Sequence, residues 1–271
     1  MLFTLLSCMH HLSPSQQQTI GGDRPAILVA PAGWDATQPL PVIFLLHGLG
    51  SSSQKQDRYM RFSKLVDEQN FLLVLPDGLE RSKDGKQAWN ATDYCCSPDG
   101  PDDVAYLTGL MDELEGMGAE DVYFTGHSNG GFMSYRMACE VPDRIGAIAG
   151  LAGSTWLDPA DCASGSPVDV LQIHGTDDTT VPYAGRPDKY PSAEDTVGRW
   201  AARAGCTEEA VEAGGFDLVL RPGEDTRRQA WRCPQPHRVE LWSIDGAGHI
   251  PLVKQDYARE VVRWLLADQP Q

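Results

Sequence analysis

Residues 121–136 constrain the fold most, because they combine a predicted strand, a sharp turn and a predicted helix around one serine. The strand covers residues 122–125, the turn is the Gly-His-Ser-Asn-Gly sequence of residues 126–130, and the helix begins at Gly131. Glycines flank Ser128 because a Cβ atom on either side of such a tight turn would collide with neighbouring backbone. The G-x-S-x-G pattern in this context indicates a serine hydroxyl that is exposed as a nucleophile.

The composition is that of one large globular domain. The chain has 271 residues, 41% of them hydrophobic, which is enough for a sizeable core. Its formal net charge of −16 disfavours nucleic acids, anionic membrane surfaces and polyanionic substrates as partners. No segment of the sequence approaches the ~18 apolar residues of a membrane span. We expect residues 23–271 to form a single catalytic domain that is monomeric.

The N-terminal residues predict export of the protein. Residues 5–8 (Leu-Leu-Ser-Cys) resemble a bacterial lipoprotein cleavage box, in which Cys8 is the lipidated residue. The apolar run is shorter than the ~7–15 residues of a secretory signal, and no basic flank precedes it. We therefore expect residues 1–22 to be a leader remnant and a polar tether. The predicted location is secreted or periplasmic, with lipid anchoring through Cys8 as an option.

Six of the seven cysteines lie in the body of the chain and predict three disulfides, which implies an oxidising compartment. They are Cys95, Cys96, Cys139, Cys162, Cys206 and Cys233. A zinc site would need paired C-x-x-C or histidine spacings, which this sequence lacks, so no metal is expected. Cys206 and Cys233 bracket one segment and are predicted to pair. Because Cys95 and Cys96 are adjacent, each is expected to reach a different partner, Cys139 or Cys162 in either order.

Strand-like and helical segments alternate along the chain. Strands are predicted at residues 26–30, 41–46, 71–75, 122–125, 145–151, 168–173, 216–220 and 238–244. Helices are predicted at residues 57–69, after residue 102, and at residues 131–140, 193–204 and 257–267. The first two strands suit an antiparallel pair. The later alternation predicts an α/β fold, with a mostly parallel sheet and helices on both faces, in which ligands bind beyond the carboxyl ends of the strands.

A serine nucleophile needs a neutral imidazole to take its proton and a carboxylate to orient that imidazole. His249 lies in a Gly-Ala-Gly-His loop after the last predicted strand, where it is free to approach Ser128. We predict His249 as the base. His47 and His174 each precede a glycine at a strand end, and we expect both to be buried, hydrogen-bonded structural residues.

The carboxylate is predicted at the end of the preceding strand, where Asp177 and Asp178 are adjacent. Spacing alone does not choose between them, since either side chain can turn inward. The resulting order along the chain is Ser128, Asp177 or Asp178, then His249. This order is the one found in α/β hydrolases and differs from those of chymotrypsin and subtilisin.

Acyl transfer at a serine also needs N–H donors for the oxyanion of the tetrahedral intermediate. The N–H of Asn129 follows Ser128 at the predicted helix N-terminus and is one candidate. The second is expected from residues 47–50 (His-Gly-Leu-Gly), whose glycines let backbone approach a substrate closely. Leu49 is the first choice in that loop and Gly50 the second.

Two tryptophans are candidates for contact with the substrate. Trp156 follows a predicted strand end and is placed to stack on an aromatic acyl group. Trp89 lies in the long irregular stretch of residues 77–101, and we consider it as a pocket wall. For both residues the alternative is ordinary packing in the core or beneath a stapled loop.

Several further motifs occur in a fixed order along the chain. They are His47-Gly-Leu-Gly50, Trp89-Asn-Ala with Cys95-Cys96, Asp102-Asp103-Val104, Gly126-His-Ser-Asn-Gly-Gly-Phe-Met133, Ala152-Gly-Ser154, His174-Gly-Thr-Asp-Asp178 with Val181-Pro182-Tyr183, and Gly248-His249. In this combination, over residues 24–267, the chain resembles the polyhydroxybutyrate depolymerase and feruloyl esterase-like branch of the α/β hydrolases. The family pattern H-G-x-x-D selects Asp178 over Asp177. The resemblance also implies disulfides and secretion.

The resemblance and the constellation together predict a secreted serine carboxylic-ester hydrolase with no metal or organic cofactor. It would act through an acyl-enzyme on polyester oligomers or on feruloyl and other aromatic esters, with acetyl esters also open. An acyltransferase or a peptidase of the same fold is the alternative. The sequence departs from the family at Ile250, where many members carry a tryptophan, and in the segment between Cys206 and Cys233. Because both regions border the predicted pocket, the substrate is the least transferable expectation.

Overall fold

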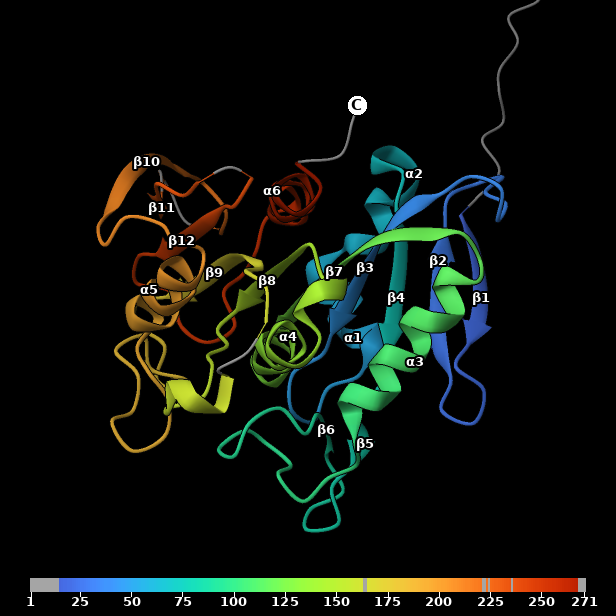
Figure 1. Ribbon diagram of the computed structural model, residues 1–271, viewed down its shortest axis with the longest axis horizontal. Coiled ribbons are helices and arrows are strands. Elements are labelled where there is room, and N and C mark those ends of the chain that lie inside the picture. The colour runs from blue at the N-terminus through green and yellow to red at the C-terminus, as the bar shows by residue number, and fades with distance from the viewer. Residues whose placement is uncertain (1–14, 163–164, 221–222, 224, 235, 268–271) are drawn as a thin grey trace, which may run out of the picture.

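A single large sheet forms the centre of the protein in the computed structural model, which describes residues 15–162, 165–220, 223, 225–234 and 236–267. Its strands are β1 (Gln16–Ile20), β2 (Ala26–Ala30), β3 (Leu40–Leu46), β4 (Leu72–Pro76), β7 (Ala119–His127), β8 (Ala147–Leu151), β9 (Asp169–Gly175), β10 (Ala210–Phe216), β11 (Thr226–Trp231) and β12 (Val239–Ile244). Their order in space is β1-β2-β4-β3-β7-β8-β9-β12-β11-β10 (Figure 1). The sheet is parallel from β4 to β12 and antiparallel at both ends, which confirms the predicted α/β fold.

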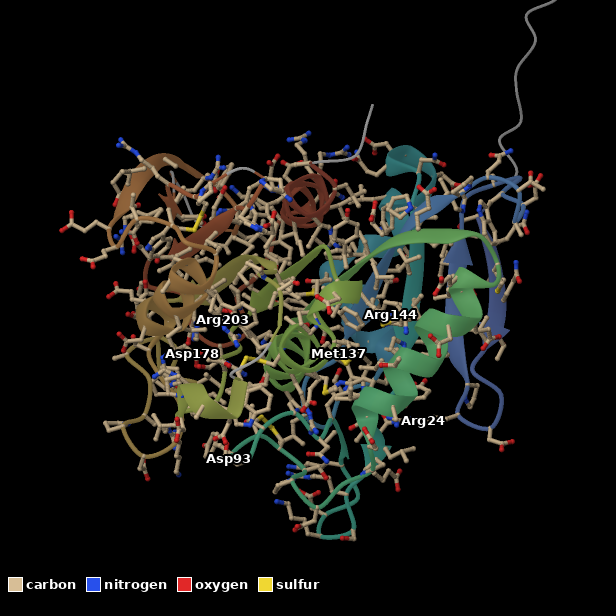
Figure 2. All side chains as sticks on the ribbon, viewed as in Figure 1. Arg24, Asp93, Met137, Arg144, Asp178 and Arg203 are labelled. Atoms are coloured by element: carbon tan, nitrogen blue, oxygen red, sulfur yellow. A yellow bond between two sulfur atoms is a disulfide. The ribbon has the colours of Figure 1, made fainter. Side chains whose placement is uncertain are left out.

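Helices cover both faces of this sheet, and side chains fill the layers between them (Figure 2). One face carries α3 (Asp103–Glu115), α4 (Asn129–Glu140) and α5 (Ala193–Arg203), and the other carries α1 (Ser53–Met60) and α6 (Gln255–Leu265). Shorter elements are α2 (Val66–Gln69) and the 3₁₀ turns η1 (Phe62–Leu65), η2 (Pro142–Arg144) and η3 (Pro159–Cys162). A separate small hairpin is formed by β5 (Leu79–Glu80) and β6 (Gln87–Ala88).

Strand β3 shows how the sequence produces this layering. Val42, Phe44 and Leu46 belong to the core on the α3 and α4 side. Ile43 and Leu45 belong to the core on the α1 and α6 side. All five side chains are fully buried, because a parallel strand with helices on both faces has no side exposed to water. The continuous apolar run of this strand follows from that position.

The register of the central strands brings their carboxyl ends to one edge of the sheet. Leu46 of β3 lies opposite Gly126 of β7, and Leu151 of β8 lies between His127 of β7 and Ile173 of β9. At the next pair, Ile244 of β12 lies opposite the end of β9. The loops that follow these strands are therefore neighbours in space although they are far apart in the chain.

The expectation for the N-terminal segment was wrong in part. Residues 16–20 were predicted to belong to a polar tether, but they form β1, which pairs antiparallel with β2. An edge strand is held by its backbone ladder and needs few apolar side chains, so its glutamines stay exposed while Ile20 is buried. Residues 1–14, including the predicted lipid-anchor residue Cys8, lie outside the described residues.

Two further strand predictions were wrong. The strands at residues 26–30 and 41–46 do not pair, because β4 lies between them and both edges of β3 are taken by parallel partners. Residues 218–220 are outside any strand, and the region instead contributes the antiparallel strands β10 and β11. The backbone N–H groups of Leu218 and Val219 donate to the carboxylate of Asp225. These two bonds take the place of backbone hydrogen bonds to a neighbouring strand.

The six cysteines of the body form three disulfides, and one of them differs from the prediction. Cys206 pairs with Cys233, as predicted. Cys139 pairs with Cys162, with Cα atoms 5.2 Å apart, and joins the end of α4 to η3. Cys95 and Cys96, which are adjacent in the chain, bond to one another. The expectation that the two adjacent cysteines reach different partners was therefore wrong.

Loss of the Cys139–Cys162 bridge should lower stability, because the bridge closes a loop with a sequence separation of 23 residues. The double variant Cys139→Ser, Cys162→Ser should lose about 3 kcal/mol in free energy of unfolding, measured by urea titration without reductant. The Cys206–Cys233 bridge closes a loop of similar separation, 27 residues. The double variant Cys206→Ser, Cys233→Ser should therefore lose a similar free energy of unfolding. Equal stability of the first variant and the wild type would contradict the bridge.

Candidate active site

Ser128 lies on a strained turn between β7 and α4. Its backbone has φ 55° and ψ −119°, a conformation that is rare for a residue with a side chain. A Cβ atom on Gly130 would lie 2.2 Å from the carbonyl oxygen of Leu46, and one on Gly126 would lie 2.5 Å from the carbonyl carbon of Gly130. The two glycines are therefore required for the turn to pack against the end of β3, as predicted from the sequence.

Three side chains from three strand ends form a hydrogen-bonded chain. His249 Nε2 lies 2.9 Å from Ser128 Oγ, and His249 Nδ1 lies 2.7 Å from Asp178 Oδ2. Because the ionised carboxylate is an acceptor only, Nδ1 carries the proton and Nε2 is left as the acceptor for the serine hydroxyl. The geometry thus joins the predicted residues in the arrangement that proton transfer from a serine requires.

Of the two adjacent aspartates, Asp178 is the one that bonds to His249. Its Oδ1 accepts hydrogen bonds from the backbone N–H groups of Thr180 and Val181 at 2.8 and 2.9 Å. Burial alone would raise the pKa of Asp178, but its hydrogen bonds, from His174 and His249 above all, hold the pKa well below its usual range. Asp177 is exposed, so the structure places the carboxylate at the position that the family pattern selected.

The loop that carries His249 is fixed from two sides. His127 Nε2 lies 2.8 Å from the backbone oxygen of His249, and the hydroxyl of Tyr59 donates to the oxygen of Pro251 at 2.8 Å. A Cβ atom on Gly175 would lie 2.3 Å from the oxygen of Ala247, so the end of β9 also approaches this loop closely. No role for His127 was predicted from the sequence, and no local pattern indicates this contact between two distant loops.

Burial is the main cause that lowers the pKa of His127 to about 4, and charge repulsion from the neighbouring His249 lowers it further. The ring is therefore neutral at pH 7, with its Nε2–H available to the His249 carbonyl.

The candidate oxyanion donors lie on both sides of Ser128. Asn129 is the first residue of α4, where a backbone N–H has no partner within the helix. In the facing loop, a Cβ atom on Gly48 would lie 3.5 Å from the Cβ of Ser128. The N–H of Gly50 is already used, since it donates to the oxygen of Gln87. Among the described residues the N–H of Leu49 has no such partner, which favours Leu49 over Gly50.

His47 and His174 occupy the structural positions expected of them. His47 is fully buried, its Nε2 accepts from the backbone N–H of Gly78, and its Nδ1 lies 2.8 Å from the oxygen of Gly48. Burial lowers the pKa of His47, which keeps the ring neutral. His174 is buried as well and bonds through its two ring nitrogens to Gln172 and to the oxygen of Val181.

The two tryptophans proposed as substrate contacts occupy different environments. Trp89 is fully buried, and its indole N–H donates to the oxygen of His47. A side chain without exposed surface cannot form a pocket wall, so that expectation was wrong for Trp89. Trp156 lines an apolar cavity of about 210 Å³ together with Trp200 of α5. The residues around this cavity do not include Ser128, Asp178 or His249.

Within the part of the chain that the structure describes, no three His, Cys, Asp or Glu side chains are grouped to hold a metal ion. In the same residues, no helix combines the length and apolar character needed to cross a membrane.

Acid should destabilise the fold, because His127 is buried in its neutral form. Between pH 6.5, its ordinary pKa, and about 4 the unfolded chain binds a proton that the folded chain does not. The free energy of unfolding should therefore fall by about 2–3 kcal/mol from pH 7.5 to pH 4.5 through this group. Urea titrations at the two pH values measure the loss. His127→Gln, which keeps an N–H donor but does not titrate, should show a loss smaller by that amount; equal losses would contradict the assignment.

Comparison with known proteins supports the fold and identifies the family. Residues 17–164 match the model of the Esterase family, described as "Putative esterase". The relative named "Putative esterase NocK", from Nocardia uniformis subsp. tsuyamanensis, is 30% identical over 77% of this chain and 64% of its own length. Feruloyl esterase B of Piromyces equi is 25% identical over 83% of this chain and 42% of its own length. The chain thus spans less than two thirds of either relative.

A solved structure extends the likeness of the fold over nearly the whole chain. The acetyl xylan esterase from Aspergillus awamori superposes with a TM-score of 0.65, covering 93% of this chain and 99% of that one at 16% identity. At this identity the likeness concerns the fold alone, which is that of the α/β-hydrolase esterases. Because the family model matches more than half of the chain, the protein belongs to the Esterase family, as the resemblance of its motifs predicted.

Proposed function

We propose that the protein is a carboxylic-ester hydrolase that works through a serine acyl-enzyme. The observation that carries the proposal is the hydrogen-bonded chain from Asp178 through His249 to Ser128, with the serine held on a strained turn. Membership of the Esterase family supports the same reading. The chain spans less than two thirds of the length of these relatives, so the activity is inferred from the site and not from what the relatives do.

In the proposed reaction Ser128 Oγ attacks the ester carbonyl carbon while His249 Nε2 takes the hydroxyl proton. The carbonyl oxygen becomes an oxyanion, which the N–H groups of Asn129 and Leu49 stabilise. The tetrahedral intermediate expels the alkoxide, which leaves as an alcohol with the proton from His249. Water then attacks the acyl carbon and gives a proton to His249. The bond between the acyl carbon and Ser128 Oγ breaks, His249 returns the proton to Oγ, and the acid is released. Asp178 holds Nδ1–H throughout and stabilises the imidazolium.

An apolar ester is the substrate class that suits the surroundings of this site. Leu49, Leu220, Ile250 and Leu252 are exposed large apolar side chains, and we call them the apolar rim. Leu49 belongs to the proposed oxyanion loop, Ile250 follows His249 directly, and Leu220 bonds through its N–H to the oxygen of Leu252. Exposed apolar residues on the loops that carry a site commonly mark a binding surface. The rim and the net charge of −16 favour polyester oligomers and feruloyl or other aromatic esters over anionic substrates.

The disulfides support an oxidising location, so we propose that the protein is secreted or periplasmic. We also propose that it works as a monomer. A lipid anchor at Cys8 would lie outside the described residues.

Ser128→Ala should abolish hydrolysis of p-nitrophenyl esters while leaving the fold intact. Loss of the nucleophile should lower kcat by at least about 10⁴-fold, since the acyl-enzyme can no longer form. The matched control is Ser134→Ala, which removes a buried hydroxyl from α4, the helix that follows Ser128. Among the described residues this hydroxyl donates to the oxygen of Gly130. The control should keep wild-type activity. Retained activity in Ser128→Ala would overturn the proposed mechanism.

Product analysis with the wild type separates the rival activities of the fold. Transfer of the acyl group to an added alcohol in preference to water would indicate an acyltransferase, and cleavage of peptides without ester hydrolysis would indicate a peptidase.

Contact between Trp156 and an aromatic acyl group stays a prediction, since the cavity that Trp156 lines includes none of the residues Ser128, Asp178 and His249. Because an aromatic contact is worth ~0.5–1.5 kcal/mol, Trp156→Leu should lower kcat/KM for methyl ferulate about fivefold relative to p-nitrophenyl acetate. The ratio of the two rates within one variant corrects for differences in folded fraction. A ratio equal to that of the wild type would show that Trp156 packs without touching the substrate.

A further inference from the structure

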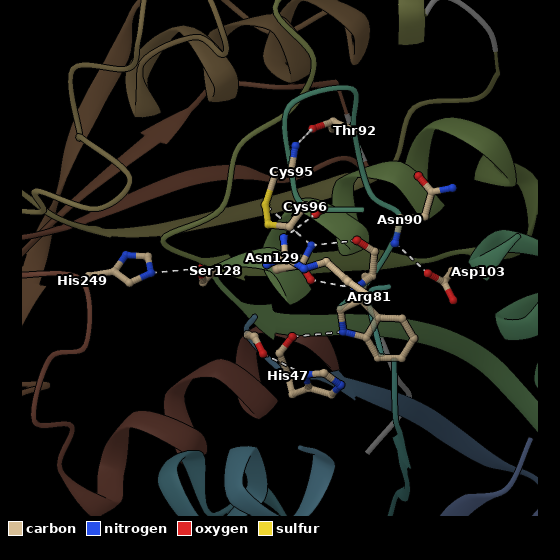
Figure 3. The surroundings of a disulfide bond; sticks show 12 residues. His47, Arg81, Asn90, Thr92, Cys95, Cys96, Asp103, Ser128, Asn129 and His249 are labelled. Carbon is tan, nitrogen blue, oxygen red and sulfur yellow. Dashed lines mark hydrogen bonds between the residues drawn. A yellow bond between two sulfur atoms is a disulfide. The ribbon is translucent and has the colours of Figure 1, made fainter. Parts of the chain in front are cut away.

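Trp89 makes three hydrogen bonds that join two loops far from it in the chain. Its indole N–H donates to the oxygen of His47 at 3.0 Å. Its backbone N–H donates to Asn129 Oδ1 at 2.7 Å, and its backbone oxygen accepts from Asn129 Nδ2 at 3.1 Å. Figure 3 shows the side chain of Asn129 beside the Cys95–Cys96 disulfide. All three residues are fully buried.

The two loops are the ones that carry the proposed oxyanion donors. The loop after β3 is held at both of its ends by residues 87–89, because His47 accepts from the Trp89 indole and Gly50 donates to the oxygen of Gln87. The side chain of Asn129, whose backbone N–H is the other donor, is held by the backbone of Trp89. One short segment therefore holds the chain on both sides of the place where an oxyanion would form.

We propose that Trp89 is a positioning residue that sets the spacing of the two oxyanion donors, Leu49 and Asn129. The inference rests on the proposed hydrolase function and concerns the same site. Trp89 does not touch the substrate. It acts by fixing the peptide groups that do, one through its indole N–H and the other through its backbone.

The segment that carries Trp89 is itself well anchored. The N–H of Asn90 donates to Asp103 Oδ2 at 2.6 Å, and Arg136 Nη1 donates to the oxygen of Asn90 at 2.6 Å. The Cys95–Cys96 pair lies against Asn129, with Cys95 Sγ 3.6 Å from Asn129 Nδ2. These charged and neutral contacts tie the segment to α3 and α4. Because its support does not depend on the substrate, the spacing of the donors is set before any ester binds.

A tryptophan is needed here because only its indole combines a large apolar body with one N–H donor. Phenylalanine fills most of the same volume but leaves the buried oxygen of His47 without its donor from this side chain. The loop is then free to move by a fraction of an ångström. Such a shift weakens contacts to the oxyanion, which strengthen in the transition state, more than contacts to the ground-state ester.

Trp89→Phe tests the inference through a kinetic effect that packing alone would not produce. We expect kcat for a p-nitrophenyl ester to fall about 10–100-fold with KM within about twofold of the wild type. Binding of an arylboronic acid, which forms a tetrahedral adduct with the serine, should weaken by a similar factor. Circular dichroism and the thermal midpoint report whether the variant is folded.

The matched control is Trp264→Phe. Trp264 is also buried, but among the described residues its indole N–H has no hydrogen-bond partner, so the same chemical change removes no bond. This variant should keep wild-type kcat and boronic acid affinity. A folded Trp89→Phe with wild-type kcat, or with a change in KM alone, would overturn the inference.

If Trp89→Phe does not fold, Asn129→Leu tests the other side of the same contact. It removes both side-chain bonds to Trp89 and keeps the backbone N–H of residue 129. The same fall in kcat and boronic acid affinity is expected, and wild-type values would again overturn the inference. A wild type that hydrolyses no ester would instead overturn the proposed function. An active wild type with unaffected variants would overturn the role of Trp89 alone.

Discussion

The contact between the Ser128 turn and the end of β3 is the constraint on which the rest of the site depends. Gly130 approaches the oxygen of Leu46 so closely that any side chain at this position would displace the strand. This approach brings the loop after β3 beside Ser128, because a Cβ atom added to Gly48 would lie 3.5 Å from the Cβ of Ser128. The strained backbone of Ser128 is tolerated because packed glycines and two buried cores hold it on both sides.

A buried carboxylate beside His249 would be costly without hydrogen-bond partners, and the structure supplies several. Asp178 follows β9 and turns back so that two backbone N–H groups meet its Oδ1 while His249 meets its Oδ2. Hydrogen bonding outweighs burial and keeps the pKa of Asp178 low, so the group stays ionised at neutral pH. His127, whose ring lies next to that of His249, is neutral and adds no competing charge. The proposed base therefore faces one anion and one neutral ring.

Sequence reasoning found the residues that lie at strand ends, and its failures have a common cause. Ser128, His249 and the Asp177-Asp178 pair could be placed because the apolar periodicity locates strand ends and parallel strands bring their ends together. The choice of Asp178 needed a family pattern, because it depends on a turn of three residues that no periodicity encodes. The burial of Trp89 and the bond between Cys95 and Cys96 depend on packing among distant segments. Local sequence patterns carry no information about such packing.

The two halves of the site are supported in different ways, and this difference bears on how substrates are chosen. The oxyanion side is held by buried hydrogen bonds from residues 87–89 and by glycine contacts, so little of it is free to vary without loss of geometry. The His249 side is held through the backbone by His127 and Tyr59, which leaves Ile250 and Leu252 exposed and unconstrained by packing. Changes in those side chains alter the apolar rim without moving the imidazole. Substrate preference can therefore diverge on this side while the chemistry stays fixed.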